Sequence, residues 1–288
     1  MFNSSGMIWR ARHFEFRFPR PAVVMAILNV TPDSFYDGGK FTDLEAAVDH
    51  AHQVEAEGAE IIDIGGESTR PGATPVSVAD ELRRVIPVIE RMAGKTSALI
   101  SIDTQKSEVA REAIAAGAHI INNIAAAHCD RAMWEVAAGT RAGYIAMHMQ
   151  GTPQTMQTAP HYENVVREVR DFFQNQLEQL SAAGVSPEQI SFDVGIGFGK
   201  TLEHNLQLLA RIEETRVAGR PMTLGVSRKS FLGRMLKLEA EARLAPAVAC
   251  AAWAAERGVE IFRTHDVAET VAALRMIEAI RNERGPLD

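Results

Sequence analysis

Short apolar segments recur along the chain, each bounded by residues that favour turns. Eight of them follow the first twenty residues, and most are rich in Ile, Val, Leu or Met while being too short for buried helices. Such segments are typical of parallel strands covered by other elements on both faces. We therefore predict strands at Val23–Leu28, Glu60–Ile64, Leu99–Ile102, His119–Ile121, Tyr144–Met147, Ile190–Val194, Met222–Val226 and Glu260–Phe262.

Helical patterns lie between most of these strands. Leu44–Gly58, Val109–Gly117 and Val165–Gly184 each end at a glycine, which adopts the left-handed conformation that closes a helix. Eight strand-and-helix units in ~270 residues match a (β/α)8 barrel in number and length. A doubly wound sheet is the alternative, because it uses the same units in a different order.

The chain shows no internal boundary. No linker rich in Pro, Gly or Ser and no shift in composition divides it. We therefore predict an α/β protein whose residues 21–288 form one TIM barrel. Residues 1–20 precede the first barrel strand and are expected to form a short arm or hairpin.

The composition argues against several classes of protein. The 288 residues carry a formal net charge of −7, whereas binders of nucleic acids or anionic membranes need a cationic face. We therefore expect neither a nucleic-acid nor a membrane partner. No apolar segment is long enough to span a bilayer, and Cys129 and Cys250 cannot build a disulfide framework. These features favour a cytoplasmic protein.

Polar side chains follow several of the predicted strands. They include Asn29, Glu67, Thr69, Arg70, Asp103, Asn122, His148, Lys229, Arg263 and His265, while Asp63 and Asp193 lie late within their own strand units. The carboxyl ends of barrel strands converge on one mouth, where active sites lie. Strands also end in polar residues simply at a surface, but this concentration of Asp, Asn, His, Arg and Lys favours a functional site.

Two loops carry candidate ligand-binding groups. The loop from Asn29 to Phe35 offers oxygen ligands that suit Mg²⁺, whose coordination shell substrate phosphates would complete. The same residue types also form ordinary turns. The loop from Gly65 to Gly72 combines a Gly-Gly pair with hydroxyl groups and with Arg70, whose guanidinium suits phosphate or carboxylate. A helix N-terminus beside an exposed arginine explains the second loop equally well.

Cationic groups follow the last two strands. Ser227-Arg-Lys-Ser230 suits an anion or an electron-rich ring edge. Arg263 and His265 are two residues apart and lie on the same side of an extended chain. The two segments together predict a clamp for a diphosphate.

A glycine-rich segment, Asp193 to Thr201, imitates two nucleotide-binding motifs. A P-loop needs glycine where Val194 stands, and the third glycine of the dinucleotide motif arrives one residue early. Nucleotide binding is therefore weakly supported. The sequence also lacks His-x-x-x-His and Cys-x-x-Cys clusters, so zinc chemistry is not expected.

Taken in order, these segments resemble the dihydropteroate synthases over about Val23 to Arg281. The matching motifs are Asn29-Val-Thr-Pro-Asp-Ser-Phe35, Asp63 to Gly72, Ser101-Ile-Asp-Thr104, His148-Met-Gln-Gly151, Gly197-Phe-Gly-Lys200, Ser227-Arg-Lys-Ser230 and Arg263-Thr-His-Asp266. The resemblance implies a (β/α)8 barrel. It also implies an enzyme that joins a dihydropterin methyl diphosphate to 4-aminobenzoate, by loss of diphosphate and attack of the arylamine on the resulting cation.

The resemblance also implies roles for individual residues. The pterin would be held by Asp103, Asn122, Asp193 and Lys229, the diphosphate would be bound by Thr69, Arg263 and His265, and the Mg²⁺ would be coordinated by Asn29. Two loops that close over the site would contain Asp33 and Arg70. The 4-aminobenzoate pocket would be shaped by Phe35, Pro71, Phe198, Lys229 and Ser230. Asp103, Lys229, Arg263 and His265 would be the catalytic residues among them. A homodimer is implied, with the amphipathic segment Val267–Ile280 as a candidate interface.

Two alternatives remain at this stage. The chain has Asn122-Asn123 where the family usually has Asn-Asp, which favours a non-catalytic paralogue that binds pterin. A pterin-barrel methyltransferase is the second, but it would not need the cationic groups at Arg70, Ser227–Ser230 and Arg263–His265 together. The synthase is the interpretation that uses all of these groups.

Overall fold

The strands form one closed parallel barrel. The computed structural model describes residues 6–31, 40–69, 72–125 and 130–283. The barrel strands run in the order β10-β3-β4-β5-β6-β7-β8-β9. Their bounds are β3 Val23–Asn29, β4 Ile61–Gly65, β5 Leu99–Asp103, β6 Ile120–Asn123, β7 Gly143–Met147, β8 Ile190–Asp193, β9 Met222–Gly225 and β10 Ile261–Thr264. All eight predicted strands are confirmed, and closure of the sheet excludes the doubly wound alternative.

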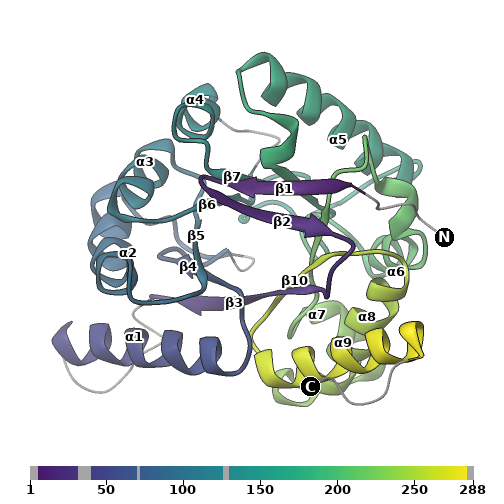
Figure 1. Cartoon of the computed structure of the whole chain (residues 1–288). Coiled ribbons are helices and arrows are strands. Elements are labelled where there is room, and N and C mark those ends of the chain that lie inside the picture. Colours follow the sequence, from purple (N-terminus) through teal and green to yellow (C-terminus); the bar gives the residue numbers. More distant parts are fainter. Residues whose placement is uncertain (1–5, 32–39, 70–71, 126–129, 284–288) are drawn as a thin grey trace.

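Helices surround the barrel, as Figure 1 shows. They are α1 Lys40–Ala56, α2 Val78–Met92, α3 Ser107–Ala116, α4 Arg131–Thr140, α5 Val165–Ala182, α6 Leu202–Ala210, α7 Ser230–Leu236, α8 Leu244–Glu256 and α9 Val267–Asn282, with short 3-10 helices η2 Pro187–Gln189, η3 Ile212–Thr215 and η4 Ala240–Arg243. The predicted glycine ends are confirmed, because Gly58, Gly117 and Gly184 all have positive φ. The apolar helix faces and the outward strand residues share one large core.

Residues 7–18 form a hairpin that closes one end of the barrel (Figure 1). Strands β1 (Met7–Ala11) and β2 (Phe14–Phe18) pair antiparallel. Trp9 is fully buried, stacks on Phe16 and donates from its indole Nε1 to the carbonyl oxygen of Gln189 at 2.8 Å. These side chains share a core with residues near the start of the barrel strands, such as Met25 and Ile145.

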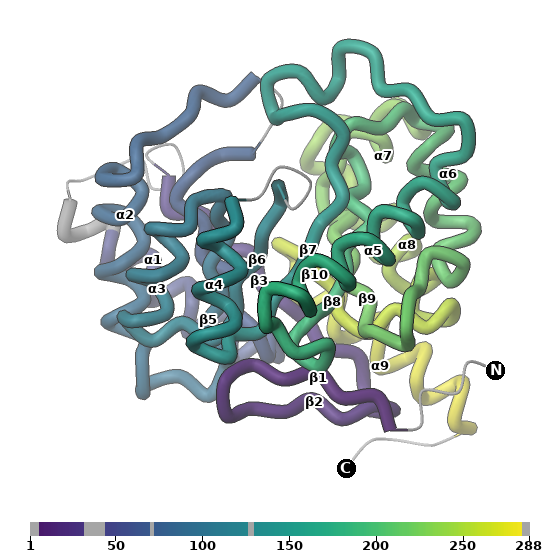
Figure 2. Tube along the Cα trace, turned by 90° about the horizontal axis from the view of Figure 1, so that it is seen from above, coloured from purple at the N-terminus to yellow at the C-terminus, as the bar shows by residue number. Residues whose placement is uncertain are grey.

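The hairpin lies at the opposite end of the barrel from the loops that follow the strands (Figure 2). The predicted arm is therefore confirmed as a hairpin, and it leaves the carboxyl-end mouth open to ligands. The division into an arm at 1–20 and a barrel at 21–288 stays a prediction.

Candidate active site

Four residues form a row across neighbouring strands at the carboxyl-end mouth. The strand register pairs Asn29 with Gly65, Gly65 with Asp103, and Asp103 with Asn122. Register partners in parallel strands project to the same face, which here is the barrel interior. A Cβ added to Gly65 would lie 3.6 Å from Asn29 Oδ1 and 3.6 Å from Asp103 Cβ. Glycine at this position therefore leaves room between the two side chains.

Arg263 is held by two carboxylates, that of Asp103 in this row and that of Asp63 beneath it. Its Nε donates to Asp63 Oδ2 at 2.6 Å, and its Nη2 donates to Asp103 Oδ2 at 2.7 Å. Asn122 Nδ2 donates to the same Asp63 oxygen at 2.9 Å. Asp63 is fully buried. The guanidinium is thus fixed in orientation by strands β4 and β5, because charge-assisted hydrogen bonds of this length are strong.

The buried carboxyl groups retain binding capacity. Burial raises the pKa of Asp103 to about 7, although the positive charge of Arg263 opposes that rise. Oδ1 of Asp63 and Oδ1 of Asp103 are buried and have no hydrogen-bond partner among the described residues. A buried oxygen without a donor is costly, so Asp103 Oδ1, which belongs to the row at the mouth, favours a ligand rich in N–H groups.

Asp193 and Lys229 face the same mouth from the other side of the barrel. Asp193 ends β8 and accepts from Gly195 N at 2.7 Å, and burial raises its pKa. Burial lowers the pKa of Lys229 to about 8, while Asp193 favours the charged form. The Lys229 ammonium lies 4.0 Å from the centre of the Phe198 ring, close enough for a cation–π interaction.

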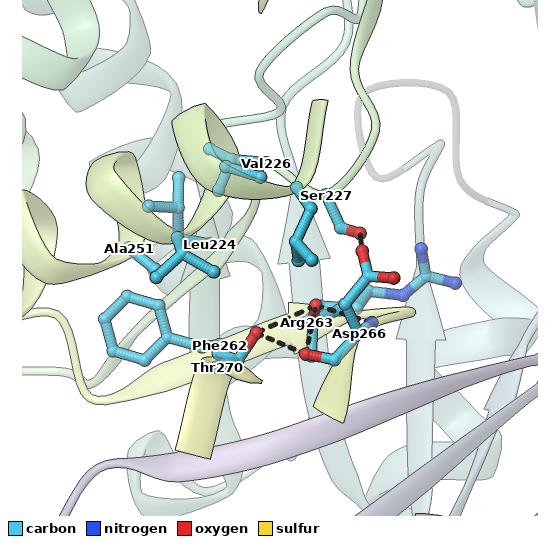
Figure 3. Close-up of a pocket in the computed structure, with 12 residues that line it drawn as sticks. Leu224, Val226, Ser227, Ala251, Phe262, Arg263, Asp266 and Thr270 are labelled. Carbon is cyan, nitrogen blue, oxygen red and sulfur yellow. Dashed lines mark hydrogen bonds between the residues drawn. The ribbon is translucent and has the colours of Figure 1, made fainter. Parts of the chain in front are cut away.

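The ends of β9 and β10 meet in a polar network, part of which Figure 3 shows. Ser227 Oγ donates to Asp266 Oδ2 at 3.2 Å and lies 3.0 Å from His265 Nδ1. Burial, reinforced by the charge of Arg263, lowers the pKa of His265 to about 4, so this imidazole is neutral at pH 7. Arg228 pairs with Asp266 at 2.6 Å and is half-exposed.

The loop after β4 is fastened to its surroundings by ion pairs. Lys106 bridges Glu67 in this loop and the fully buried Glu81 of α2. Glu67 Oε1 also accepts from Val76 N at 3.0 Å, and Arg84 donates to Gly66 O at 2.7 Å. These contacts position the partly buried segment that leads to Thr69.

The structure therefore gathers most of the predicted site residues. Those at one mouth are Asn29, Asp103, Asn122, Asp193, Phe198, Lys229, Arg263 and His265, with Thr69 in the loop after β4 and Ser230 as the first residue of α7. Asp33, Phe35, Arg70 and Pro71 lie outside the described residues. Sequence reasoning noted Asp63 but assigned it no role. Its position two residues before Gly65, on the same face of the strand, was the signal that could have found it.

Asn123 does not belong to the mouth. Strand side chains alternate between faces, so Asn122 points inward and Asn123 outward. Asn123 Nδ2 donates to Tyr144 Oη at 2.8 Å, and Asn123 Oδ1 accepts from Ala125 N at 2.9 Å. Tyr144 belongs to the core beneath the helices. Asn123 therefore lies outside the mouth, and the support that it lent to a non-catalytic paralogue disappears.

Two further observations concern metals and membranes. Over the described ranges, no group of three or more His, Cys, Asp or Glu side chains is arranged to hold a metal ion. Within the same part of the chain, none of the helices is both long and apolar enough to cross a membrane.

Comparison with known proteins agrees with this geometry. The family described as pterin binding enzyme matches residues 25–265. The dihydropteroate synthase of Escherichia coli strain K12 is 50% identical over 256 residues, which cover 89% of this chain and 90% of that protein.

Two solved structures are similar in sequence and in fold. The Xanthomonas albilineans dihydropteroate synthase with 4-aminobenzoic acid is 44% identical, with a TM-score of 0.88 over 96% of this chain and 98% of that chain. The Burkholderia cenocepacia dihydropteroate synthase complexed with 7,8-dihydropteroate is 42% identical, with a TM-score of 0.86 over 96% of this chain and 98% of that chain. By sequence, fold and the residues gathered at its mouth, the chain belongs to the pterin binding enzymes and, within them, to the dihydropteroate synthases.

Proposed function

We propose that this barrel joins the methylene carbon of (7,8-dihydropterin-6-yl)methyl diphosphate to the amino nitrogen of 4-aminobenzoate, giving 7,8-dihydropteroate and diphosphate. The observation that carries the proposal is the pairing of buried carboxyl groups with buried cations at one mouth. Asp103 and Asp193 face Lys229 and Arg263 there. Similarity to synthases solved with 4-aminobenzoic acid and with 7,8-dihydropteroate supports the same reaction.

The pterin would lie between the two halves of the mouth. Its amino and ring N–H groups would donate to Asp103 and Asp193, whose buried oxygens favour such donors. Asn122 and Lys229 would donate to its ring oxygen and nitrogen atoms. Arg263 would not need to move, because Asp63 and Asp103 already orient it.

Loss of diphosphate leaves positive charge on the pterin methylene and ring. Ionised Asp103 would stabilise that charge in a site with little water, where electrostatic stabilisation is strong. The amino nitrogen of 4-aminobenzoate then attacks the methylene carbon and loses a proton. Phe198, Lys229 and Ser230 would shape the pocket of this second substrate, together with Phe35 and Pro71.

The diphosphate would be held by Thr69, Arg263 and His265. His265 is neutral at pH 7, since burial and Arg263 lower its pKa. An arriving anion reverses that balance, because a nearby negative charge raises the pKa of an imidazole. His265 would therefore become a better hydrogen-bond donor only when the leaving group is bound. Asp33 and Arg70 would close over the site from their loops.

The residues present also fit Mg²⁺. Asn29 offers an amide oxygen beside the space left by Gly65. Mg²⁺ usually takes one or two protein oxygens and completes its shell with substrate phosphates and water, so a large cluster of side chains is not required. When bound, Mg²⁺ would neutralise charge on the leaving diphosphate. Asn29 would hold it.

The assay of this function is direct. The purified protein, supplied with the pterin diphosphate, Mg²⁺ and 4-aminobenzoate, should release diphosphate with saturation in both substrates. Asp193→Asn should retain the fold, because an amide oxygen can still accept from Gly195 N. Its turnover should fall by about a hundredfold or more, since a site carboxylate is lost. Absence of turnover in the folded wild-type protein, with pterin binding intact by calorimetry, would instead support a binding paralogue.

The assembly and location of the protein also belong to this proposal. We infer a homodimer formed through the side of the barrel that carries α9, and a cytoplasmic enzyme whose partners are its two small-molecule substrates.

A further inference from the structure

Lys200, in the glycine-rich segment, is not used by the proposed reaction. The segment resembles a phosphate-binding loop, yet the Lys200 side chain is only 1% exposed and its ammonium lies inside the protein. Nζ lies 3.0 Å from His148 Nδ1 and donates to Phe198 O at 3.0 Å and to His148 O at 3.3 Å. The lysine therefore joins the loop after β7 to the loop after β8, and it does not point at a ligand.

The two loops are in close backbone contact around this lysine. A Cβ at Gly195 would overlap the carbonyl oxygen of His148, and one at Gly199 would lie 2.9 Å from Gln150 N. Tyr162 Oη also donates to Gly199 O at 2.9 Å. The segment around Phe198 is thus held by contacts on both sides.

Phe198 connects this buried junction to the mouth. Its carbonyl oxygen accepts from Lys200, while its ring lies 4.0 Å from the Lys229 ammonium. The ring also packs against Met147, Met149 and Met156 in a small apolar cluster. A shift of the Phe198 backbone would move a wall of the site and change the environment of Lys229.

We propose that Lys200 is a positioning residue for the arylamine subsite: by binding Phe198 O together with the carbonyl oxygen and Nδ1 of His148, it sets where the Phe198 ring lies beside Lys229. This inference rests on the proposed function, because Phe198 is assigned there to the 4-aminobenzoate pocket. Asp63, Asp103 and Asn122, on the other side of the mouth, are held by their bonds to one another and to Arg263 and not by Lys200. Loss of Lys200 should therefore affect the arylamine more than the pterin.

The state of the lysine agrees with an internal structural contact. Burial lowers the pKa of Lys200 to about 7, and burial lowers the pKa of His148 well below its usual value. His148 is therefore neutral at pH 7, and its Nδ1 can accept from the ammonium. Burying a lysine is costly even though the charge of Asp193 favours its protonated form, which argues that its placement serves the site.

The experiment compares Lys200→Met with Gln189→Met. Gln189 is equally buried, donates to Ala137 O and Ala142 O, and lies near the hairpin end of the barrel. Both variants leave buried carbonyl groups without a donor, so both should lower stability to urea. Only Lys200→Met should raise the KM for 4-aminobenzoate, by about tenfold or more, since small misplacements of a site are costly. Its KM for the pterin diphosphate should rise less than its KM for 4-aminobenzoate, because Asp103 and Asn122 are held by contacts away from this segment.

Two further variants keep the proposal open to refutation. Lys200→Gln retains two donors on a shorter side chain, and it should restore part of the arylamine KM. Tyr162→Phe removes the bond to Gly199 O at the other side of the same segment; if Lys200→Met does not fold, this mild change should still raise that KM about two- to fivefold.

The outcomes separate the two proposals. An inactive wild-type protein overturns the proposed function and this inference with it. An active wild type, with equal changes of both KM values in Lys200→Met and Gln189→Met, overturns the role of Lys200 alone. An unchanged KM for 4-aminobenzoate in Lys200→Met would also overturn the role of Lys200. If Lys200→Met does not fold, an unchanged KM for 4-aminobenzoate in Tyr162→Phe would overturn it.

Discussion

Asp63 acts through the residue that it holds. Its Oδ2 accepts from Arg263 and from Asn122, and it lies one layer below the row of residues that faces the ligand. Asp63→Asn should therefore loosen Arg263 without removing a group that touches substrate. A hydrogen bond to a charged group is worth about 1.5–3 kcal/mol, so we expect kcat/KM for the pterin diphosphate to fall roughly ten- to hundredfold.

Ser101 provides the matched control for this change. It is the register partner of Asp63 on the next strand, and its buried Oγ has no hydrogen-bond partner within the described part of the chain. Ser101→Ala should change kcat/KM by less than about twofold, because no bond is lost. Steady-state kinetics of both variants make the comparison. Equal losses in the two would contradict the assignment of Asp63.

Asp103 and Lys229 should make the reaction depend on pH near neutrality. Burial raises the pKa of Asp103 to about 7, so its carboxylate forms as pH rises through that value. Burial lowers the pKa of Lys229 to about 8, so its ammonium is lost as pH rises further. If the reaction needs ionised Asp103 and protonated Lys229, kcat/KM rises through about pH 7 and falls through about pH 8.

A variant assigns the alkaline limb of this profile. Lys229→Arg keeps its charge at high pH, so the fall above about pH 8 should disappear even though activity is reduced. Kinetics between about pH 5.5 and 9.5 cover both limbs. If kcat/KM of Lys229→Arg still falls with a midpoint near pH 8, a group other than Lys229 is responsible for the alkaline limb.

At this scale, residue chemistry was more predictable from the sequence than residue partners were. The types and positions of Asp103, Asn122 and Lys229 follow from strand ends alone. The bond from Arg263 to Asp63 does not, because it joins residues 200 positions apart and depends on how the barrel closes. Asn123 shows the opposite error: a departure from a family pattern looked functional until strand alternation placed it in the core.

Elements followed the apolar pattern closely. The predicted Val23–Leu28 strand is observed at Val23–Asn29, and the helix predicted to end at Gly117 ends at Ala116. The N-terminal segment was predicted only as an arm or hairpin. Its strand pairing, which places Trp9 opposite Phe16, depends on packing against the end of the barrel, which the sequence pattern does not show. The close contact between the loop after β7 and the glycine-rich loop after β8 was not predictable, because it depends on packing between separate elements.

Gly195 provides a prediction about that contact. An alanine there must adopt φ near +66° and would also overlap the carbonyl oxygen of His148. Gly219 has φ near +61° but has nothing within 4 Å of an added Cβ. Gly219→Ala should therefore cost about 1–2 kcal/mol from backbone strain alone.

Gly195→Ala should cost about 1–3 kcal/mol more than Gly219→Ala, because overpacking adds to the strain. Unfolding in urea measures both losses, and the difference between them isolates the loop contact. If the two variants lose the same stability, the loops are less tightly packed than the structure indicates.

The distribution of charge over the whole molecule explains why its net charge was a poor guide to its ligands. The chain carries −7, yet Lys229 and Arg263 are concentrated at one mouth together with the buried carboxyl groups that they face. A sequence shows the number of charges but not their arrangement, which arises when eight strands bring distant residues together. The net charge of −7 still argues against a broad cationic surface, while the charge near the ligand depends on a few side chains.

The outer surface of the barrel carries exposed apolar side chains on α8 and α9, which follow β9 and β10. Met276 and Ile280 of α9 are 61% and 66% exposed and lie four residues apart, so they share one face of the helix. α9 packs against α8, and Trp253 of α8 is also half-exposed. These helices lie side by side in both views (Figures 1 and 2). Such a surface is typical of contact with a second copy of the chain.

We expect sedimentation velocity to show a dimer, and the double variant Met276→Glu with Ile280→Glu to weaken it. Burial of one large apolar side chain is worth about 1.5–3 kcal/mol, so losing one side chain's worth of burial already raises the dissociation constant about tenfold or more. Phe14→Glu is the control, because Phe14 is exposed on the hairpin at the far end of the barrel. That variant should sediment as the wild type does. A monomeric wild type would show that there is no such interface, and a dimer that withstands both glutamates would place the interface elsewhere.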